Sequence, residues 1–155
     1  MRLKVITVGR RPPKWVEAGF NEFATRMPRH LGIELIEVAP GAARKSGDVE
    51  RAREQEAEAL LTAAGAARVV ALDERGSAWS TRDLAHRLEQ FMQAGGDTAF
   101  LIGGADGLAE RCRRQAAHCW SLSALTLPHL LVRVVLAEQL YRAFTLLDGH
   151  PYHRD

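Results

Sequence analysis

The sequence predicts an α/β fold, a mostly parallel β-sheet with helices on both faces. The main observation is that short apolar runs alternate five times with longer segments of helical period, an order typical of parallel sheets. The second observation is that proline, glycine and capping residues stand at the ends of these segments. With 155 residues and no repeat or low-complexity segment, the chain is expected to be a single domain over residues 1–155.

The elements are expected in the following order. Strands are predicted at residues 3–8, 34–38, 69–72, 99–102 and 121–125. Helices are predicted at residues 15–26, 48–64, 81–93, 108–118 and 130–147.

Local signals support several helix ends. Pro13 stands just before the first helix, where a missing backbone N–H costs little. Ser80 and Asp83 have the spacing of a capping box. Gly65 and Gly95 follow the second and third helices, where a left-handed residue is favoured.

The last predicted helix is apolar on more than one face, which is typical of a helix in the core or at a subunit interface. Within it, Glu138 and Arg142 have the spacing of helical neighbours. They either pair with each other or face the active site of a partner subunit.

Composition is that of a soluble globular protein, with 46% apolar and 26% charged residues. No segment has the ~18 apolar residues of a membrane span, and the first residues lack a signal-peptide cleavage site. We therefore expect a cytoplasmic protein with no membrane partner. The formal net charge is +2, yet residues 1–53 hold 11 basic and 6 acidic residues. This excess fits a polyanionic partner and, equally, an ordinary solvated surface.

The two cysteines, Cys112 and Cys119, are seven residues apart, a spacing that places both on one side of a helix. No Cys-x-x-Cys pattern and no Cys/His ligand set accompanies them. Reduced, partly buried thiols are therefore expected.

Residues 40–47 form the one long irregular segment in the first half, with Arg44 and Lys45 between flexible residues. Such a loop either wraps a phosphate or stays mobile. The sequence does not choose between these two interpretations.

The strongest site signal is the apolar run that breaks into Gly103 and Gly104, followed by Gly107. Glycines at a strand end let a ligand approach the bare backbone. Leu72 and Asp73 end the preceding strand, and adjacent carboxyl ends of parallel strands form a ligand crevice. A Gly-x-Gly-x-x-Gly fingerprint after the first strand and a phosphate-binding loop motif are both absent, which argues against dinucleotide binding and nucleotide hydrolysis.

Other chemistries have weaker support. Ser121 and Ser123 lack the turn that exposes a nucleophilic serine. His150 and His153 have no nearby third ligand, so no metal site is expected. His129, a lone histidine after Pro128, is more often structural than catalytic in such a position.

Several long motifs resemble the bacterial ribosomal RNA large subunit methyltransferase H family, and the resemblance spans essentially the whole chain. They are Leu-Ile-Gly-Gly-Ala-Asp-Gly-Leu at 101–108, Trp-Ser-Leu-Ser-Ala-Leu-Thr-Leu-Pro-His at 120–129, Val-Arg-Val at 132–134, Glu-Gln-Leu-Tyr-Arg-Ala at 138–143 and His-Pro-Tyr-His-Arg at 150–154. The first strand, Pro13-x-Trp15 and residues 71–76 fit the family too.

The resemblance implies a SPOUT-type methyltransferase with a C-terminal trefoil knot and no separate RNA-binding domain. It implies a homodimer that uses S-adenosylmethionine to methylate N3 of a pseudouridine in 23S rRNA within the assembled ribosome. Two alternatives remain: a SPOUT methyltransferase that acts on another RNA, such as a transfer RNA, and a non-catalytic ribosome-binding factor.

Carried over by position, the resemblance implies a cofactor site made of strand-end and loop residues. These are Leu72, Gly103, Gly104, Leu122, Ser123, Ala124, Leu125, Thr126 and Leu127. Because N3–H must lose its proton, a base that titrates near neutrality is required. We expect His153, with Tyr152 and Arg154, to form the substrate end of the site, in the pocket of the same chain or of the dimer partner. His129 is the rival base.

Overall fold

The computed structural model describes residues 1–9 and 11–152. Within them, five strands form one sheet in the order β2-β1-β4-β3-β5, and all neighbouring strands are parallel. The strands are β1 (Arg2–Val8), β2 (Gly32–Val38), β3 (Arg68–Ala78), β4 (Thr98–Ile102) and β5 (His118–Ser121). The helices are α1 (Lys14–Ala24), α2 (Val49–Ala64), α3 (Thr81–Ala94), α4 (Glu110–Gln115) and α5 (His129–Asp148), with 3-10 helices η1 (Arg29–Leu31) and η2 (Ala42–Ser46). The α/β class is confirmed, and the trefoil knot remains a prediction.

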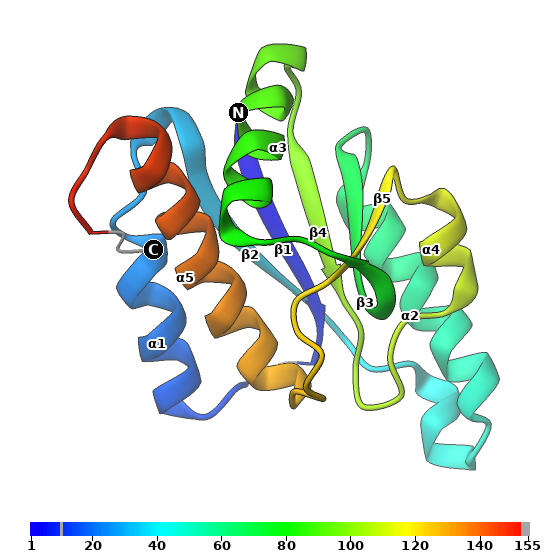
Figure 1. Cartoon of the computed structure of the whole chain (residues 1–155). Coiled ribbons are helices and arrows are strands. Elements are labelled where there is room, and N and C mark those ends of the chain that lie inside the picture. Colours follow the sequence, from blue (N-terminus) through cyan, green and yellow to red (C-terminus); the bar gives the residue numbers. More distant parts are fainter. Residues whose placement is uncertain (10, 153–155) are drawn as a thin grey trace.

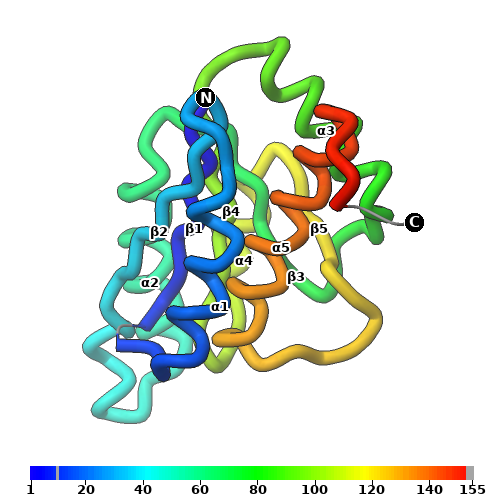
Figure 2. Tube along the Cα trace, turned by 90° about the vertical axis from the view of Figure 1, so that its left-hand side faces the viewer, coloured from blue at the N-terminus to red at the C-terminus, as the bar shows by residue number. Residues whose placement is uncertain are grey.

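Helices cover both faces of the sheet (Figure 1). Helix α5 packs between α1 and α3 on one face, and α2 and α4 pack on the other (Figures 1 and 2). Successive strand residues alternate between the two layers, so that Leu3 and Val5 lie in the core with α5, whereas Ile6 and Val8 lie in the core with α2. Burial on both sides explains why the strands are continuous apolar runs.

The predicted caps at Ser80, Gly65 and Gly95 are confirmed. The hydroxyl of Ser80 accepts a hydrogen bond from the Asp83 N–H at 3.1 Å, and the Asp83 carboxylate accepts one from the Ser80 N–H at 2.8 Å. Gly65 and Gly95 end α2 and α3 with positive φ angles of 58° and 79°. Helix α5 buries residues around much of its circumference, as predicted.

Two predicted elements are wrong in their extent. The predicted strand 121–125 is β5, which ends at Ser121, and the residues up to Pro128 connect it to α5. The predicted helix 108–118 is the much shorter α4, because the Ala117 N–H donates to the Val69 carbonyl at 2.8 Å and the chain joins the sheet there. Cys112 is therefore in a helix and Cys119 in a strand, so the two do not share a helix face. Both thiols are free, as expected, and Cys112 is buried.

Strand β3 is longer than the predicted strand 69–72. Its pairing with β5 breaks after Leu72 and resumes at Ser77. The irregular part of β3, residues 73–76, lies against β5, because a Cβ atom on Gly76 would be only 2.6 Å from the backbone nitrogen of Trp120. It carries Asp73 and Arg75.

Helix α5 runs along the sheet, so the connection before it and the residues after it lie at opposite ends of the helix. It begins near the carboxyl ends of β3 and β4 and ends beside α1, at the opposite end of its 20 residues (Figure 1). None of the helices among the described residues has the length and apolar character needed to span a membrane.

Candidate functional site

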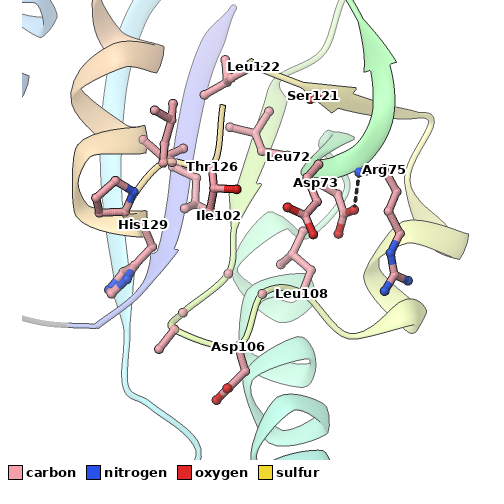
Figure 3. A pocket seen from close by; sticks show the side chains of 18 of the residues that line it. Leu72, Asp73, Arg75, Ile102, Asp106, Leu108, Ser121, Leu122, Thr126 and His129 are labelled. Carbon is pink, nitrogen blue, oxygen red and sulfur yellow. Dashed lines mark hydrogen bonds between the residues drawn. The ribbon is translucent and has the colours of Figure 1, made fainter. Parts of the chain in front are cut away.

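A cavity of about 770 Å³ opens at the carboxyl ends of β3 and β4 (Figure 3). Three segments far apart in the sequence supply most of its lining, namely residues 72–75, 102–108 and 121–129. This is the end of a parallel sheet at which ligands bind, and the volume is typical of small-molecule sites. The predicted crevice between the β3 end and the glycines is confirmed.

The glycine turn, residues 103–107, brings bare main chain to the cavity. The Gly107 N–H donates to the Gly104 carbonyl at 3.0 Å, and Gly107 has a φ angle of 77°. A Cβ atom on Gly103 would lie 2.7 Å from the Gly107 carbonyl oxygen. A side chain at position 103 is therefore incompatible with this turn.

Apolar side chains complete the centre of the cavity. Leu72 at the end of the first part of β3 and Ile102 at the end of β4 point into it, between His129 on one side and Asp73 on the other (Figure 3). The parallel register sets Leu72 beside Ile102. An apolar surface flanked by peptide groups suits a flat heterocyclic group.

The connection from β5 to α5 forms the opposite wall and is held by its own hydrogen bonds. The hydroxyl of Ser121 donates to the Ser123 carbonyl at 3.0 Å, and the Leu125 N–H donates to the Ser123 hydroxyl at 2.9 Å. The side chain of Leu125 is 75% exposed. Eight of the nine residues predicted to bind the cofactor line the cavity, and Ala124 does not: the eight are Leu72, Gly103, Gly104, Leu122, Ser123, Leu125, Thr126 and Leu127.

An ion pair between Asp73 of β3 and Arg113 of α4 joins β3 to the segment that follows β4. The Asp73 carboxylate accepts hydrogen bonds from the Arg75 N–H at 2.9 Å and from Arg113 at 3.2 Å. Arg113 and Arg53 both donate to the carbonyl of Leu108, at 2.9 and 2.6 Å. The sequence does not indicate a role for these two arginines, because no local motif around positions 53 and 113 points to Leu108.

Segment 40–47 is held by contacts within the chain. It forms η2, and the buried carboxylate of Glu56 accepts hydrogen bonds from the Gly41 N–H and from Arg44, each at 2.8 Å. Arg44 also forms an ion pair with Asp106 in the glycine turn. These two carboxylates raise the pKa of Arg44. The side chain thus links α2 to the glycine turn and is already paired.

His129 is the first residue of α5 and lines the cavity. Burial, with a smaller contribution from the positive charge of Arg133, lowers the pKa of His129 below its usual 6.5. The imidazole is therefore neutral at pH 7 and able to accept a proton.

Tyr152 lies far from the cavity of its own chain. Its hydroxyl donates to Glu138 at 3.0 Å, and its ring packs edge-on against Tyr141 with 4.7 Å between centroids. Burial and the Glu138 carboxylate raise the pKa of Tyr152. Of the two interpretations of Glu138 and Arg142, this chain shows the pairing: the Arg142 Nε–H donates to Glu138 at 2.8 Å.

The other two predicted catalytic residues, His153 and Arg154, lie outside the described residues. Among the residues that the structure does describe, no group of three or more His, Cys, Asp or Glu side chains is placed to hold a metal ion.

Known proteins with similar sequences cover the full chain. One is a "Ribosomal RNA large subunit methyltransferase H" from Hahella chejuensis, 50% identical over 100% of both chains. A second, of the same name from Nitrosococcus oceani, is 52% identical over 99% of both. Among solved structures, a probable methyltransferase from Bordetella pertussis Tohama I has a similar fold, with a TM-score of 0.61, 17% identity, and coverage of 92% of this chain and 93% of that one.

Residues 1–153 match the sequence profile described as "Predicted SPOUT methyltransferase". This match and the identity to full-length relatives lead to one conclusion. The chain belongs to the SPOUT methyltransferase family, together with the ribosomal RNA large subunit methyltransferase H proteins.

Proposed function

We propose that this methyltransferase uses S-adenosylmethionine to methylate N3 of a pseudouridine in 23S rRNA of the assembled ribosome. The observation that carries the proposal is the cavity at the glycine turn, in a chain about half identical over its full length to relatives named for ribosomal RNA methylation. Residues 1–155 act as a single methyltransferase domain in the cytoplasm, where assembled ribosomes are found.

The residues of the cavity fit this cofactor. Gly103 and Gly104 leave the main chain open to a close contact, and the peptide groups of residues 122–127 match the hydrogen-bonding edge of an adenine. Leu72 and Ile102 provide an apolar surface for its ring. The cofactor supplies an activated sulfonium methyl group, so the chain needs neither a nucleophile nor a metal of its own.

The contribution of the protein is then positioning and proton removal. The two walls fix the direction in which the acceptor nitrogen approaches, which is catalysis by orientation. Two histidines are candidates to take the N3 proton: His129, which lines the cavity in its neutral form, and His153 of the tail. Arg154 grips an RNA phosphate or a base carbonyl.

A homodimer brings the tail to the cavity. Helix α5 holds 20 residues and is about 30 Å long, so the tail starts far from the cavity of its own chain. The tail of a second copy, carrying Tyr152, His153 and Arg154, completes the site instead. The exposed side chain of Leu125 beside the cavity is available for contact with that copy.

The test is transfer of labelled methyl groups from S-adenosylmethionine to ribosomes from cells that lack this gene, with nuclease digestion to identify the product. Label in N3-methylpseudouridine, on whole ribosomes and not on stripped RNA, supports the proposal. Cofactor binding without transfer to ribosomes points to another RNA substrate. Absence of both cofactor binding and methyl transfer contradicts an enzymatic role.

A further inference from the structure

A second cleft, of about 310 Å³, lies at the outer edge of the sheet beside β5. We call it the edge cleft. Its lining consists of Arg75, Gly76, Ser77, Trp79, Arg87, Ala117, His118 and Cys119. It contains two arginines and, among the described residues, no carboxylate. An anion is therefore the kind of group that it attracts.

The guanidinium group of Arg87 lies over an aromatic platform. The ring of Trp79 stacks on Trp120, with 4.9 Å between centroids and 15° between planes. The guanidinium carbon of Arg87 lies 4.3 Å from the centroid of Trp79, and it takes the free face because Trp120 covers the other. A guanidinium that rests on a ring keeps its N–H edge for a planar, bidentate contact with a phosphate.

One carboxylate lies near this charge without lining the cleft. Asp83, one helical turn before Arg87, accepts a hydrogen bond from the Ser80 N–H at 2.8 Å as part of the helix cap. This bond, with a smaller contribution from the charge of Arg87, lowers the pKa of Asp83, and Asp83 is not among the residues that line the edge cleft. Burial, Arg87 and Arg68 lower the pKa of His118, so this histidine is neutral at pH 7. The arginines supply the positive charge of the cleft.

The edge cleft adjoins the cofactor cavity. Arg75 lines both, and it stands at the rim of the cavity in Figure 3, next to Asp73. Its side chain is exposed, and its backbone N–H is fixed by Asp73 at 2.9 Å. When a nucleotide of an RNA enters the cavity, the nucleotides next to it in the RNA therefore lie close to the edge cleft.

We propose that the edge cleft binds the sugar-phosphate backbone of the RNA substrate beside the target nucleotide, with Arg75 and Arg87 as the phosphate ligands. This assignment rests on the proposed function, since it names how the same site holds its rRNA. Such contacts set the register of the strand and carry no sequence information. An acidic protein segment fits the location less well, because the cleft continues into the cavity where a nucleotide must enter.

The test compares the wild type with Arg75→Ala, Arg87→Ala and the double variant. Arg2→Ala is the matched control, since Arg2 is an exposed arginine at the opposite end of the sheet. S-adenosylmethionine binding is measured by calorimetry, ribosome binding by co-sedimentation at 50–200 mM KCl, and methyl transfer to ribosomes that lack the modification by initial rates.

Arg87→Ala should bind the cofactor normally and keep its kcat at saturating ribosomes, because Arg87 does not line the cofactor cavity. In the double variant, the KM for ribosomes should be about tenfold higher at 150 mM KCl. The slope of log Kd against log salt should fall by about 1–2, as expected for two lost phosphate contacts. Arg75→Lys and Arg87→Lys should restore that slope, because they restore the charge.

Wild-type affinity and slope in the double variant would overturn the assignment. So would weaker binding with an unchanged slope, which indicates a contact with ribosomal protein. If the wild type transfers no methyl group to ribosomes, the proposed function fails, and the co-sedimentation slopes still decide whether the edge cleft binds RNA.

Discussion

Gly103 is the residue at which one added methyl group most directly disturbs the cofactor site. Gly103→Ala places a Cβ atom 2.7 Å from the Gly107 carbonyl oxygen, so the turn has to move. Overpacking of this kind costs about 1–3 kcal/mol. When this cost falls on the cofactor-bound state, cofactor binding is roughly 5- to 150-fold weaker. Calorimetric titration with S-adenosylmethionine measures this loss.

Gly32→Ala is the control for that substitution. Gly32 has an ordinary φ angle of −74°, and a Cβ atom there meets no atom within 4 Å. This variant should bind the cofactor as the wild type does. Equal affinities for the two variants would show that the turn at Gly103 does not shape the site.

Glu56 is the buried charge that fixes segment 40–47, and it depends on Arg44. Arg44→Ala leaves the carboxylate, which is 3% exposed, with the Gly41 N–H as its remaining hydrogen-bond donor among the described residues. We expect the free energy of unfolding to fall by about 2 kcal/mol, because a buried charge loses its counter-ion. Urea unfolding measures the change.

Arg2→Ala removes an exposed pair with Glu34 and serves as the comparison. Its effect should stay well below that of Arg44→Ala, as expected for an exposed ion pair. The double variant Arg44→Ala/Glu56→Gln should recover part of the lost stability. Similar losses in Arg44→Ala and Arg2→Ala would contradict the structural role of Glu56.

At the scale of the elements, helix α4 makes stability depend on pH through its buried thiol. Burial raises the pKa of Cys112 from 9.0 to about 11. Below pH 9 the thiol is protonated in the folded and unfolded chain, and its stabilising contribution is complete. Between pH 9 and about 11 only the unfolded chain loses the proton, so unfolding becomes more favourable by up to about 1.4 kcal/mol per pH unit.

Cys112→Ala lacks this titration. The stability advantage of the wild type over the variant should therefore shrink as the pH rises from 8 to 10.5, in urea unfolding at a series of pH values. A constant difference would show that the thiol does not titrate on unfolding.

The sequence could predict the elements whose pattern is local. Strands β1 and β4 and helices α2 and α3 have long periodic runs and caps such as Ser80 and Gly65, so their positions were predicted to within a residue or two. Residues 116–125 were not, because their limits depend on pairing. The Ala117 N–H bonds to Val69, 48 positions earlier, and Ser123 turns the chain out of the sheet.

The same distinction holds for the candidate site. Gly103, Gly104 and Leu72 could be predicted because they stand at strand ends, and residues 122–127 came from the family resemblance. The role of Arg44 stayed open in the sequence, since its partners Glu56 and Asp106 meet it only in the folded chain. Arg53 and Arg113 were missed for the same reason.

At the scale of the whole molecule, we propose that the tail of a second copy completes the cavity. Deletion of residues 150–155 should abolish methylation and leave cofactor binding largely intact, because the cavity is built from other segments. Methyl transfer and calorimetry measure the two effects. Lost cofactor binding would contradict this division of labour.

Complementation tests the dimer directly. Co-expression of the deleted chain with Gly103→Ala should restore about a quarter of the wild-type activity, since half of the dimers are mixed and each has one complete site. The deleted chain alone should be inactive, and Gly103→Ala alone should keep only the low activity that its weaker cofactor binding allows. Absence of recovery in mixed dimers would mean that the tail serves its own chain.

The glycine turn and the β5–α5 connection also bear on inhibition. Much of the cavity wall is main chain, and Gly103 tolerates no side chain. An inhibitor that bonds to those peptide groups contacts atoms that point mutations do not replace. Substitutions that give resistance to such a compound would have to occur at Leu72, Ile102 or the exposed rim. The cofactor binds to the same surface, so these substitutions would weaken cofactor binding as well.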